Sequence, residues 1–229
     1  MNWLWSNLDL VWSLTVAHIG LSALPIVLGF LVSLPIGWAA NRYRLSRPVL
    51  LTIGGILYAI PSLPLFVAMP ALIGTKILDP ANVIVALSIY ALALMVRTTA
   101  DALDSVPGDV VESATAIGFS AWRRFWSVEL PLAGPVLLAG LRVVSVSTVS
   151  LVSVGALIGV SNLGNLFTDG LNRYFPFEVG VGIVTIMLVA LVFDLVLVLI
   201  GRLLLPWTRL DKRSGRLGRN AAMKAVTGA

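Results

Sequence analysis

The chain has 229 residues, of which 58% are hydrophobic and 12% are charged, and its mean hydropathy is +0.96. Soluble domains carry about 25% charged residues, so this composition excludes a soluble globular protein and predicts an all-α integral membrane protein. The chain has no cysteine and one histidine, which excludes a disulfide framework, a thiol nucleophile and a Cys- or His-cluster metal site. Its net charge of +5 comes from basic residues spread over loops and a tail, so we expect no binding of nucleic acid.

Five apolar runs predict a polytopic protein, because each approaches the roughly 20 residues that a helix needs to cross the hydrocarbon core. The first 15 residues contain three tryptophans and predict an interfacial segment, since indole rings prefer the membrane surface. No Lys or Arg precedes Arg42, so the basic region of a cleaved signal peptide is missing, and we expect the first span to remain in the mature protein. The predicted spans lie near residues 17–40, 49–73, 82–97, 134–160 and 179–204.

The positions of Lys and Arg predict the orientation of the spans, because basic loops stay in the cytoplasm. Basic residues gather at 42–47, at 97–124 and at 202–224, whereas the other side of the membrane has only Lys76 and Arg173. This pattern places the N-terminus outside and the C-terminus in the cytoplasm. We divide the chain into an interfacial segment (1–15), a transmembrane domain (16–207) with a hairpin (104–131), and a basic cytosolic tail (208–229).

Small residues and prolines mark the first two spans. Gly29, Ser33 and Gly37 are four residues apart, a spacing that permits close contact between helices. Pro61 and Pro64 interrupt the second span, and a backbone carbonyl freed by proline must be satisfied by protein or by a water-lined cavity. An interior position is therefore favoured, and we predict that three residues of this interruption line a translocation path: Tyr58, Pro61 and Ser62.

The first half of the hairpin predicts a short helix. Val110, Ala114 and Ile117 recur at i, i+4 and i+7 and give it one apolar face. Pro107 can occupy an early position, since the first turn of a helix does not need its missing N–H. Gly118 can take the left-handed conformation that ends a helix.

The second half of the hairpin predicts an amphipathic helix that starts at the N-cap residue Ser120. Its apolar face holds Trp122, Phe125 and Trp126, and Leu130-Pro131 is expected to close the unit before the next span. A helix–glycine–helix elbow on the face of a membrane protein is a compact, rigid knob. Such a knob is suited to docking another protein, and an ordinary amphipathic cytosolic hairpin is the alternative.

The fourth span carries polar residues that we assign to the translocation path, namely Arg142, Ser147, Ser150 and Ser153, and the fourth and fifth spans each carry one intramembrane charge. Ser147, Ser150 and Ser153 are three residues apart, so their positions shift only slightly around the helix from one to the next. They could line a polar path, or they could serve helix packing. Arg142 lies in the fourth span and Asp194 in the fifth, where charges are costly and face the interior or find partners. The two could pair; alternatively Arg142 reaches the interface and neighbouring hydroxyls hold Asp194.

The hairpin resembles the coupling-loop signature of ABC-importer permeases. That family has Glu-Ala-Ala, a glycine six residues after the Glu, and Ile-x-Leu-Pro ten residues further on. This chain has the same spacing, with Ser113 in place of the first alanine and Val128 in place of the isoleucine. The matching residues are Glu112, Ser113, Ala114, Gly118, Val128, Leu130 and Pro131.

The resemblance implies the type I ABC-importer permease fold in a prokaryotic cytoplasmic membrane. The coupling loop of that family inserts into a groove on a cytosolic ATPase dimer, which binds ATP and Mg²⁺. A second permease subunit, identical or paralogous, and an extracytoplasmic binding protein complete such an importer. This chain has no G-x-x-x-x-G-K-[ST] phosphate loop, so we expect a non-catalytic subunit without a cofactor or metal of its own.

Further residues resemble the subfamily that transports osmoprotectants such as glycine betaine, choline, carnitine or proline. They are Ile60-Pro61-Ser62-Leu63, Leu141-Arg142, Ala156-Leu157-Ile158-Gly159 with Leu163-Gly164, and Asp194. Permeases for methionine and other amino acids share the fold and the coupling motif, so they are one alternative. A self-sufficient channel or secondary transporter is an alternative from another class, for which a dedicated intramembrane ion site would be expected.

Overall fold

The structure is a computed structural model that describes residues 2–43 and 45–207, and the described residues form helices and no strand. The all-α prediction is therefore confirmed, while Arg44 and the predicted tail 208–229 lie outside the described residues. In chain order the helices are α1 (Asn2–Ser6), α2 (Leu8–Arg42), α3 (Ser46–Ala59), α4 (Ser62–Ile73), α5 (Pro80–Asp104), α6 (Gly108–Ala116), α7 (Ala121–Arg124), the π-helix η1 (Phe125–Glu129), α8 (Leu130–Val152), the 3-10 helix η2 (Ser153–Ile158), α9 (Asn165–Asn172) and α10 (Pro176–Leu204).

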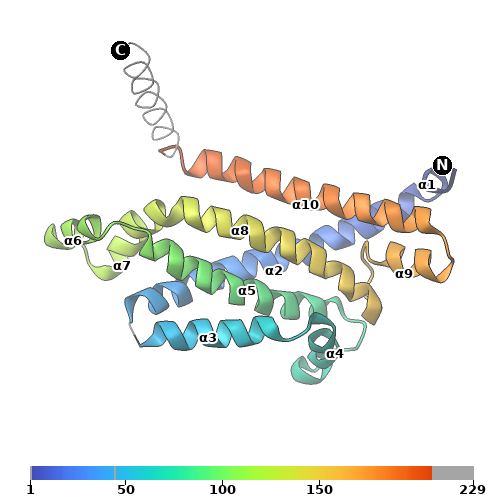
Figure 1. Cartoon of the computed structure of the whole chain (residues 1–229), viewed down its shortest axis with the longest axis horizontal. Coiled ribbons are helices and arrows are strands. Elements are labelled where there is room, and N and C mark those ends of the chain that lie inside the picture. Colours follow the sequence, from blue (N-terminus) through green and yellow to red (C-terminus); the bar gives the residue numbers. More distant parts are fainter. Residues whose placement is uncertain (1, 44, 208–229) are drawn as a thin grey trace, which may run out of the picture.

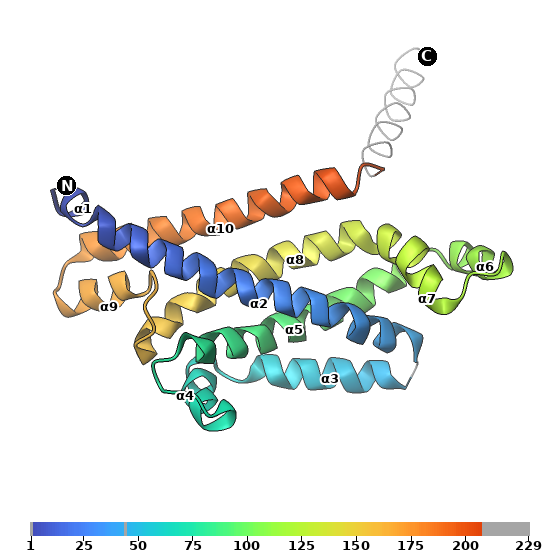
Figure 2. The ribbon, with the colours of Figure 1, turned by 180° about the vertical axis from the view of Figure 1, so that it is seen from behind.

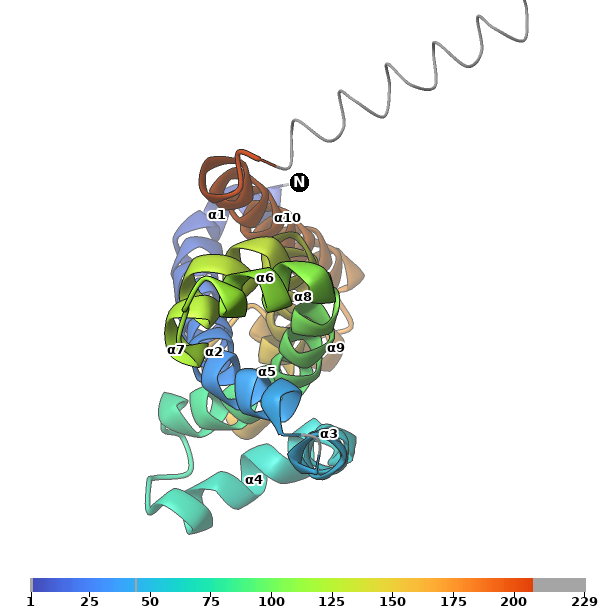
Figure 3. The same ribbon diagram turned by 90° about the vertical axis from the view of Figure 1, so that its left-hand side faces the viewer.

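The long helices lie roughly along one axis (Figure 1), where α3, α5, α8 and α10 follow one another across the molecule. Seen from behind, α2 crosses this layer diagonally and packs on α5 and α8 (Figure 2). The α6–α7 hairpin lies at one end, and α9 and the N-terminus lie at the other. We call these the hairpin end and the far end. Viewed along the axis, α6 and α7 stand in front of the bundle and α4 projects to one side (Figure 3).

The predicted ridge of small residues on α2 is its contact with α5. A Cβ added to Gly29 would lie 2.6 Å from the Cβ of Ala91, and one added to Gly37 would lie 2.5 Å from the Cβ of Thr99. Between them, the hydroxyl oxygens of Ser33 and Thr99 are 3.3 Å apart. The two backbones approach so closely that neither glycine position has room for a side chain, as the spacing predicted.

The spans are longer than the apolar runs alone indicate. Helix α2 begins at Leu8, so the second half of the segment expected at the interface is continuous with the first span. By length and composition, four helical stretches could cross a membrane, and α3 with α4 could form a fifth although the pair is bent by 101°. Residues Ala121–Ile158 form one such stretch, because nothing between the hairpin and the fourth span breaks the helix.

At its far end, α8 tightens into the 3-10 helix η2. The N–H of Ser153 bonds the carbonyl of Ser150, three residues back, instead of the carbonyl of Val149. The Nε2 atom of His18, a fully buried residue of α2, lies 3.0 Å from the Val149 carbonyl oxygen. A carbonyl oxygen can only accept, so the imidazole donates and replaces the missing helical bond. The lone histidine is thus a packing residue that holds this change of helix type.

Candidate functional site

The hairpin turns at Gly118, which has a φ of +91°. The N–H of Phe119 bonds the carbonyl of Ala114 (3.1 Å) and the N–H of Gly118 bonds that of Thr115 (3.0 Å). This pair of bonds is the Schellman arrangement, in which a glycine takes the left-handed position after the helix. The Ser120 hydroxyl then accepts from the N–H of Arg123 at 3.4 Å, so both predicted caps are confirmed.

In the first limb, α6, Ala114 is buried and marks the side of the helix that faces the bundle. Glu112 and Ser113 are exposed. The predicted apolar face is only partly right, because Ile117 is 75% exposed and points away from the bundle. Val111 takes its place and packs against the core near the hairpin. Ile117 is the C-cap residue of α6, directly before the left-handed turn at Gly118. An exposed isoleucine beside a glycine turn leaves an apolar tip on the hairpin.

The second limb does not end at Leu130-Pro131, as the sequence analysis expected. It runs through η1 into α8, and Pro131 occupies the first turn of α8. The N–H of Leu130 bonds the carbonyl of Phe125, five residues back, which defines the π turn. In a regular helix the ring of Pro131 would clash with the carbonyl four residues earlier, and the wider turn precedes that position. The hairpin and the fourth span are therefore one continuous helical lever.

Arg124 joins the two limbs of the hairpin, a role that the sequence analysis missed. Its Nε donates to Glu129 Oε1 at 2.5 Å and its Nη1 donates to Thr115 Oγ1 at 2.6 Å. The Arg124 and Glu129 side chains are only 15% and 8% exposed. The two residues are five apart, outside the three- and four-residue spacings of helical pairs, so sequence spacing gives no signal for this bond.

Aromatic rings fix the hairpin to the bundle. The ring of Trp38 in α2 lies 5.9 Å from that of Phe125 and 6.1 Å from that of Trp122. Trp126 contacts Phe125 at a centroid distance of 5.0 Å. Phe125 is buried, whereas Trp122 is 59% exposed. Edge-to-face contacts of this kind stabilise an aromatic cluster beyond its buried area.

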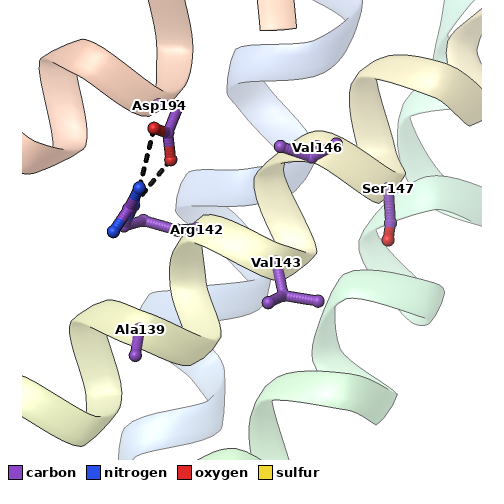
Figure 4. A pocket seen from close by; sticks show the side chains of 6 residues that line it. All are labelled: Ala139, Arg142, Val143, Val146, Ser147 and Asp194. Atoms are coloured by element: carbon purple, nitrogen blue, oxygen red, sulfur yellow. Dashed lines mark hydrogen bonds and ion pairs between the residues drawn. The ribbon is translucent and has the colours of Figure 1, made fainter. Parts of the chain in front are cut away.

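Arg142 and Asp194 form a bidentate ion pair between α8 and α10 (Figure 4). Arg142 Nε lies 2.6 Å from Asp194 Oδ1 and Nη2 lies 2.8 Å from Oδ2. The side chains remain 42% and 27% exposed, at the edge of an open groove of about 390 Å³ that Ser147 also lines. Of the two alternatives left by the sequence, the mutual pair is correct, and it satisfies both intramembrane charges at once.

The bend between α3 and α4 holds the other predicted path residues. Pro64 has no N–H for the carbonyl of Ile60, and the hydroxyl of Tyr90 in α5 donates to it instead at 2.6 Å. The exposed ring of Tyr58 meets the buried ring of Tyr90 edge-on at 5.8 Å. Protein thus satisfies the freed carbonyl, which is one of the two possibilities that the sequence allowed.

The predicted path residues fall into separate groups. Arg142 and Ser147 share the groove beside α10, and Ser150 is exposed on the next turn of α8. Ser153 belongs to η2, where its hydroxyl donates to the Ser150 carbonyl at 2.6 Å. Tyr58, Pro61 and Ser62 belong to the α3–α4 bend, and α3 and α4 lie on the other side of α5 from α10 (Figure 1). Among the described residues no group of three or more His, Cys, Asp or Glu could hold a metal ion.

Residues 32–210 match the family of the binding-protein-dependent transport system inner membrane component. The chain belongs to this family. It is 31% identical to the choline transport system permease protein OpuBB of Bacillus subtilis, over 84% of this chain and 87% of the relative. It is 32% identical to the osmoprotectant import permease protein OsmW of Salmonella typhimurium, over 85% of this chain and 91% of the relative.

The permease also has the fold of a solved importer. A chain of the MetNI methionine ABC transporter, in an inward-facing conformation, is similar with a TM-score of 0.72 and 21% sequence identity. The similarity covers 84% of this permease and 96% of that chain. Family and apolar helices together make it a multi-pass subunit of the inner, or plasma, membrane. The type I ABC-importer permease fold that the coupling motif implied is confirmed.

Proposed function

We propose that this permease is the membrane subunit of an ATP-driven importer for an osmoprotectant such as glycine betaine, choline, carnitine or proline. The α6–α7 hairpin carries the proposal. It is fixed to the bundle, it has an exposed apolar tip, and its second limb continues directly into a membrane span. The substrate class rests on the names of the relatives OpuBB and OsmW. The chain itself is non-catalytic, and ATP and Mg²⁺ belong to a partner ATPase dimer.

This function requires three protein partners and a lipid bilayer around the permease. The ATPase dimer takes the hairpin end, where exposed Glu112, Ser113 and Ile117 surround the Gly118 turn. A second permease subunit completes the path, and an extracytoplasmic binding protein delivers the solute at the far end. Lipid covers much of α10, of which little is buried within the chain. This arrangement puts the hairpin and the C-terminus in the cytoplasm and the N-terminus outside, as the basic residues predict.

The hairpin would transmit force through its polar bonds. When the ATPase dimer closes, it draws the two hairpins of the importer together. Arg124 ties α6 to η1 through Thr115 and Glu129, so the two limbs move as one body. The π turn passes this motion into α8, whose pair with Asp194 moves α10 as well. Alternating access then results from the swing of these helices around the path.

Solute selectivity is expected to lie mainly in the binding protein. A quaternary ammonium group is held by several aromatic faces through cation–π attraction. At the α3–α4 bend the buried ring of Tyr90 meets the ring of Tyr58 at a right angle, and Tyr58 is the accessible ring of the two. One such ring gives weak contact with a cation. The permease would therefore pass betaine-like solutes without binding them tightly.

Reconstitution tests the proposal. The purified permease alone should hydrolyse no ATP, and it should bring down an ATPase subunit from its own membrane. Proteoliposomes with the permease, that ATPase and the binding protein should accumulate radiolabelled glycine betaine or choline when ATP is supplied. ATP turnover by the permease alone, or solute flux without ATP and ATPase, would overturn the importer assignment. Accumulation of methionine in place of betaines would overturn the substrate class.

A further inference from the structure

Two described helices end in the Schellman turn with glycine in its left-handed position. One is α6 at Gly118, and the other is η2 at Gly159, which has a φ of +84°. At Gly159 the N–H of Val160 bonds the carbonyl of Gly155 at 3.1 Å and the N–H of Gly159 bonds that of Ala156 at 3.0 Å. Glycine is the usual residue at this position because it has no Cβ to clash with the backbone.

Helix α9 ends in the same turn, but with a tyrosine in the glycine position. The N–H of Phe175 bonds the carbonyl of Gly170 at 2.8 Å, and the N–H of Tyr174 bonds that of Leu171 at 3.1 Å. Tyr174 has a φ of +52°, and no other non-glycine residue in the described ranges has a positive φ. A bulky side chain in this conformation is strained, since its Cβ approaches the backbone. Strain of this kind persists only where the surrounding structure enforces it, and such positions cluster at functional sites.

The side chain of Tyr174 contributes nothing to the packing of this chain. It is 93% exposed, and within residues 2–43 and 45–207 its ring and hydroxyl have no ring contact or hydrogen bond. The neighbouring Phe175, in contrast, turns inward and meets the ring of Trp3 at 5.9 Å. The strained position therefore displays an aromatic side chain that is free of contacts within the described residues and accessible to an outside partner.

The turn that displays Tyr174 is held firmly on both sides. Arg173 Nη2 lies 2.6 Å and 2.5 Å from the two carboxylate oxygens of Glu178, which is fully buried in the first turn of α10. A Cβ added to Gly170 would lie 2.7 Å from a methyl carbon of Val179, so α9 and α10 are in close contact. The backbone at Tyr174, and with it the direction of its Cα–Cβ bond, is consequently held before any partner arrives, which lowers the entropic cost of binding.

We propose that Tyr174 is a docking contact for the extracytoplasmic binding protein of the importer; this inference rests on the proposed function. The α9–α10 turn lies at the far end, opposite the coupling hairpin (Figure 1). Helix α10 has 29 residues, a length of about 44 Å against a hydrocarbon core of about 30 Å. Tyr174 precedes its first residue, so it lies outside the core, where a soluble protein can reach it.

A binding protein explains the strained position better than lipid does. Aromatic residues of the membrane interface need only the right depth, and the exposed positions 171 and 177 beside the turn offer that depth without backbone strain. A protein interface needs one ring in one direction, and tyrosine is enriched among the few residues that dominate such interfaces. Rigid aromatic anchors also lose little conformational entropy on binding.

The test uses a substitution that relieves the strain while it removes the side chain. The variants Tyr174→Gly and Tyr174→Asn both suit a left-handed position. Each is assembled with the ATPase in nanodiscs, and the importer's own binding protein, loaded with glycine betaine, is titrated against ATPase activity. We expect the half-saturating concentration of binding protein to rise by about tenfold or more. The basal ATPase activity and the melting temperature of the complex should be unchanged or higher.

The matched control is Trp12→Ala, which removes another exposed aromatic side chain from the same permease. It should leave the half-saturating concentration unchanged. Wild-type titration curves for both Tyr174 variants would overturn the inference, and so would an equal shift in Trp12→Ala, because that result indicates a general effect of membrane anchoring. If the wild-type complex shows no stimulation by the binding protein at all, the proposed function itself fails, and the two outcomes are therefore distinguishable.

Discussion

The two ends of α8 depart from α-helical geometry in opposite directions. At the hairpin end the helix widens into the π turn η1, and the buried Arg124–Glu129 pair closes it. At the far end it tightens into η2, and a neutral bond from His18 satisfies the freed carbonyl of Val149. A buried ion pair whose partner is removed leaves an uncompensated charge, whereas the loss of a neutral bond leaves only a dipole unpaired.

This difference indicates a division of mechanical roles. The end that meets the proposed ATPase is braced by charge and by the extra link from Arg124 to Thr115. At the far end the freed carbonyl of Val149 is held by a neutral bond from His18, which resists deformation less than an ion pair does. We therefore expect the hairpin end to act as a stiff joint and the far end to yield as the helix swings. Substitutions along α8 test this contrast.

The largest effect is expected from Gly118→Val, which breaks the stiff end at its turn. A left-handed conformation costs a non-glycine residue roughly 1–2 kcal/mol, and a branched side chain more, so α7 should rotate relative to α6. Uptake and ATPase association should be lost while membrane abundance stays normal, since the spans are untouched. Uptake assays with an ATPase pull-down measure this. Wild-type uptake at equal expression would exclude the hairpin as the coupling element.

Arg124→Met should give the next largest effect. It leaves the Glu129 carboxylate buried without a partner, and such single removals cost ~3–5 kcal/mol. The double variant Arg124→Met/Glu129→Met should recover thermal stability but keep a low ratio of uptake to ATP hydrolysis, because the link to Thr115 is still missing. Arg123→Met is the control, since Arg123 lies over the exposed side of the hairpin, 4.6 Å from the ring of Phe119.

Melting curves of the purified complex and coupled ATPase–uptake assays measure these variants. A double variant with full coupling would show that Arg124 stabilises the hairpin without transmitting motion.

Asp194→Leu tests the middle of α8, away from both ends. It leaves Arg142 without its bidentate partner inside the membrane, so the amount of inserted permease should fall. Arg142→Leu/Asp194→Leu should restore insertion, because no charge then remains unpaired. Quantitative immunoblots of membrane fractions compare the variants. If Asp194→Leu inserts as well as the double variant, the pair does not hold α10 on α8.

The smallest effect is expected from His18→Leu at the yielding end. The Val149 carbonyl loses its donor, which costs ~1–3 kcal/mol for a buried group. Melting temperature should drop modestly, and amide hydrogen exchange should increase at the far end of α8 while the hairpin end is unaffected. His18→Gln keeps an N–H donor and should recover part of the loss. Equal exchange at both ends in His18→Leu would contradict the proposed contrast.

Local sequence rules determined much of this protein. Composition and apolar runs predicted the membrane helices, because a helix in lipid must be long and apolar whatever its neighbours are. The four-residue ridge on α2 and the caps at Gly118 and Ser120 were also predictable, since each depends on residues a few positions apart in the sequence. The coupling motif was recognisable because its spacing lies within one continuous segment of the chain. These signals were sufficient to predict the fold and the family.

The tertiary structure alone decided which distant polar groups meet. Arg142 pairs with Asp194, 52 residues away, and Tyr90 reaches the Ile60 carbonyl, 30 residues away. The Arg124–Glu129 bond and the continuous helix from η1 into α8 depend on a π turn that no spacing rule predicts. The exposed Tyr174 occupies a left-handed turn where α9 packs on α10. Sequence periodicity reports the environment of a residue's own helix, whereas the partner of a buried polar group depends on how separate helices rotate and approach each other.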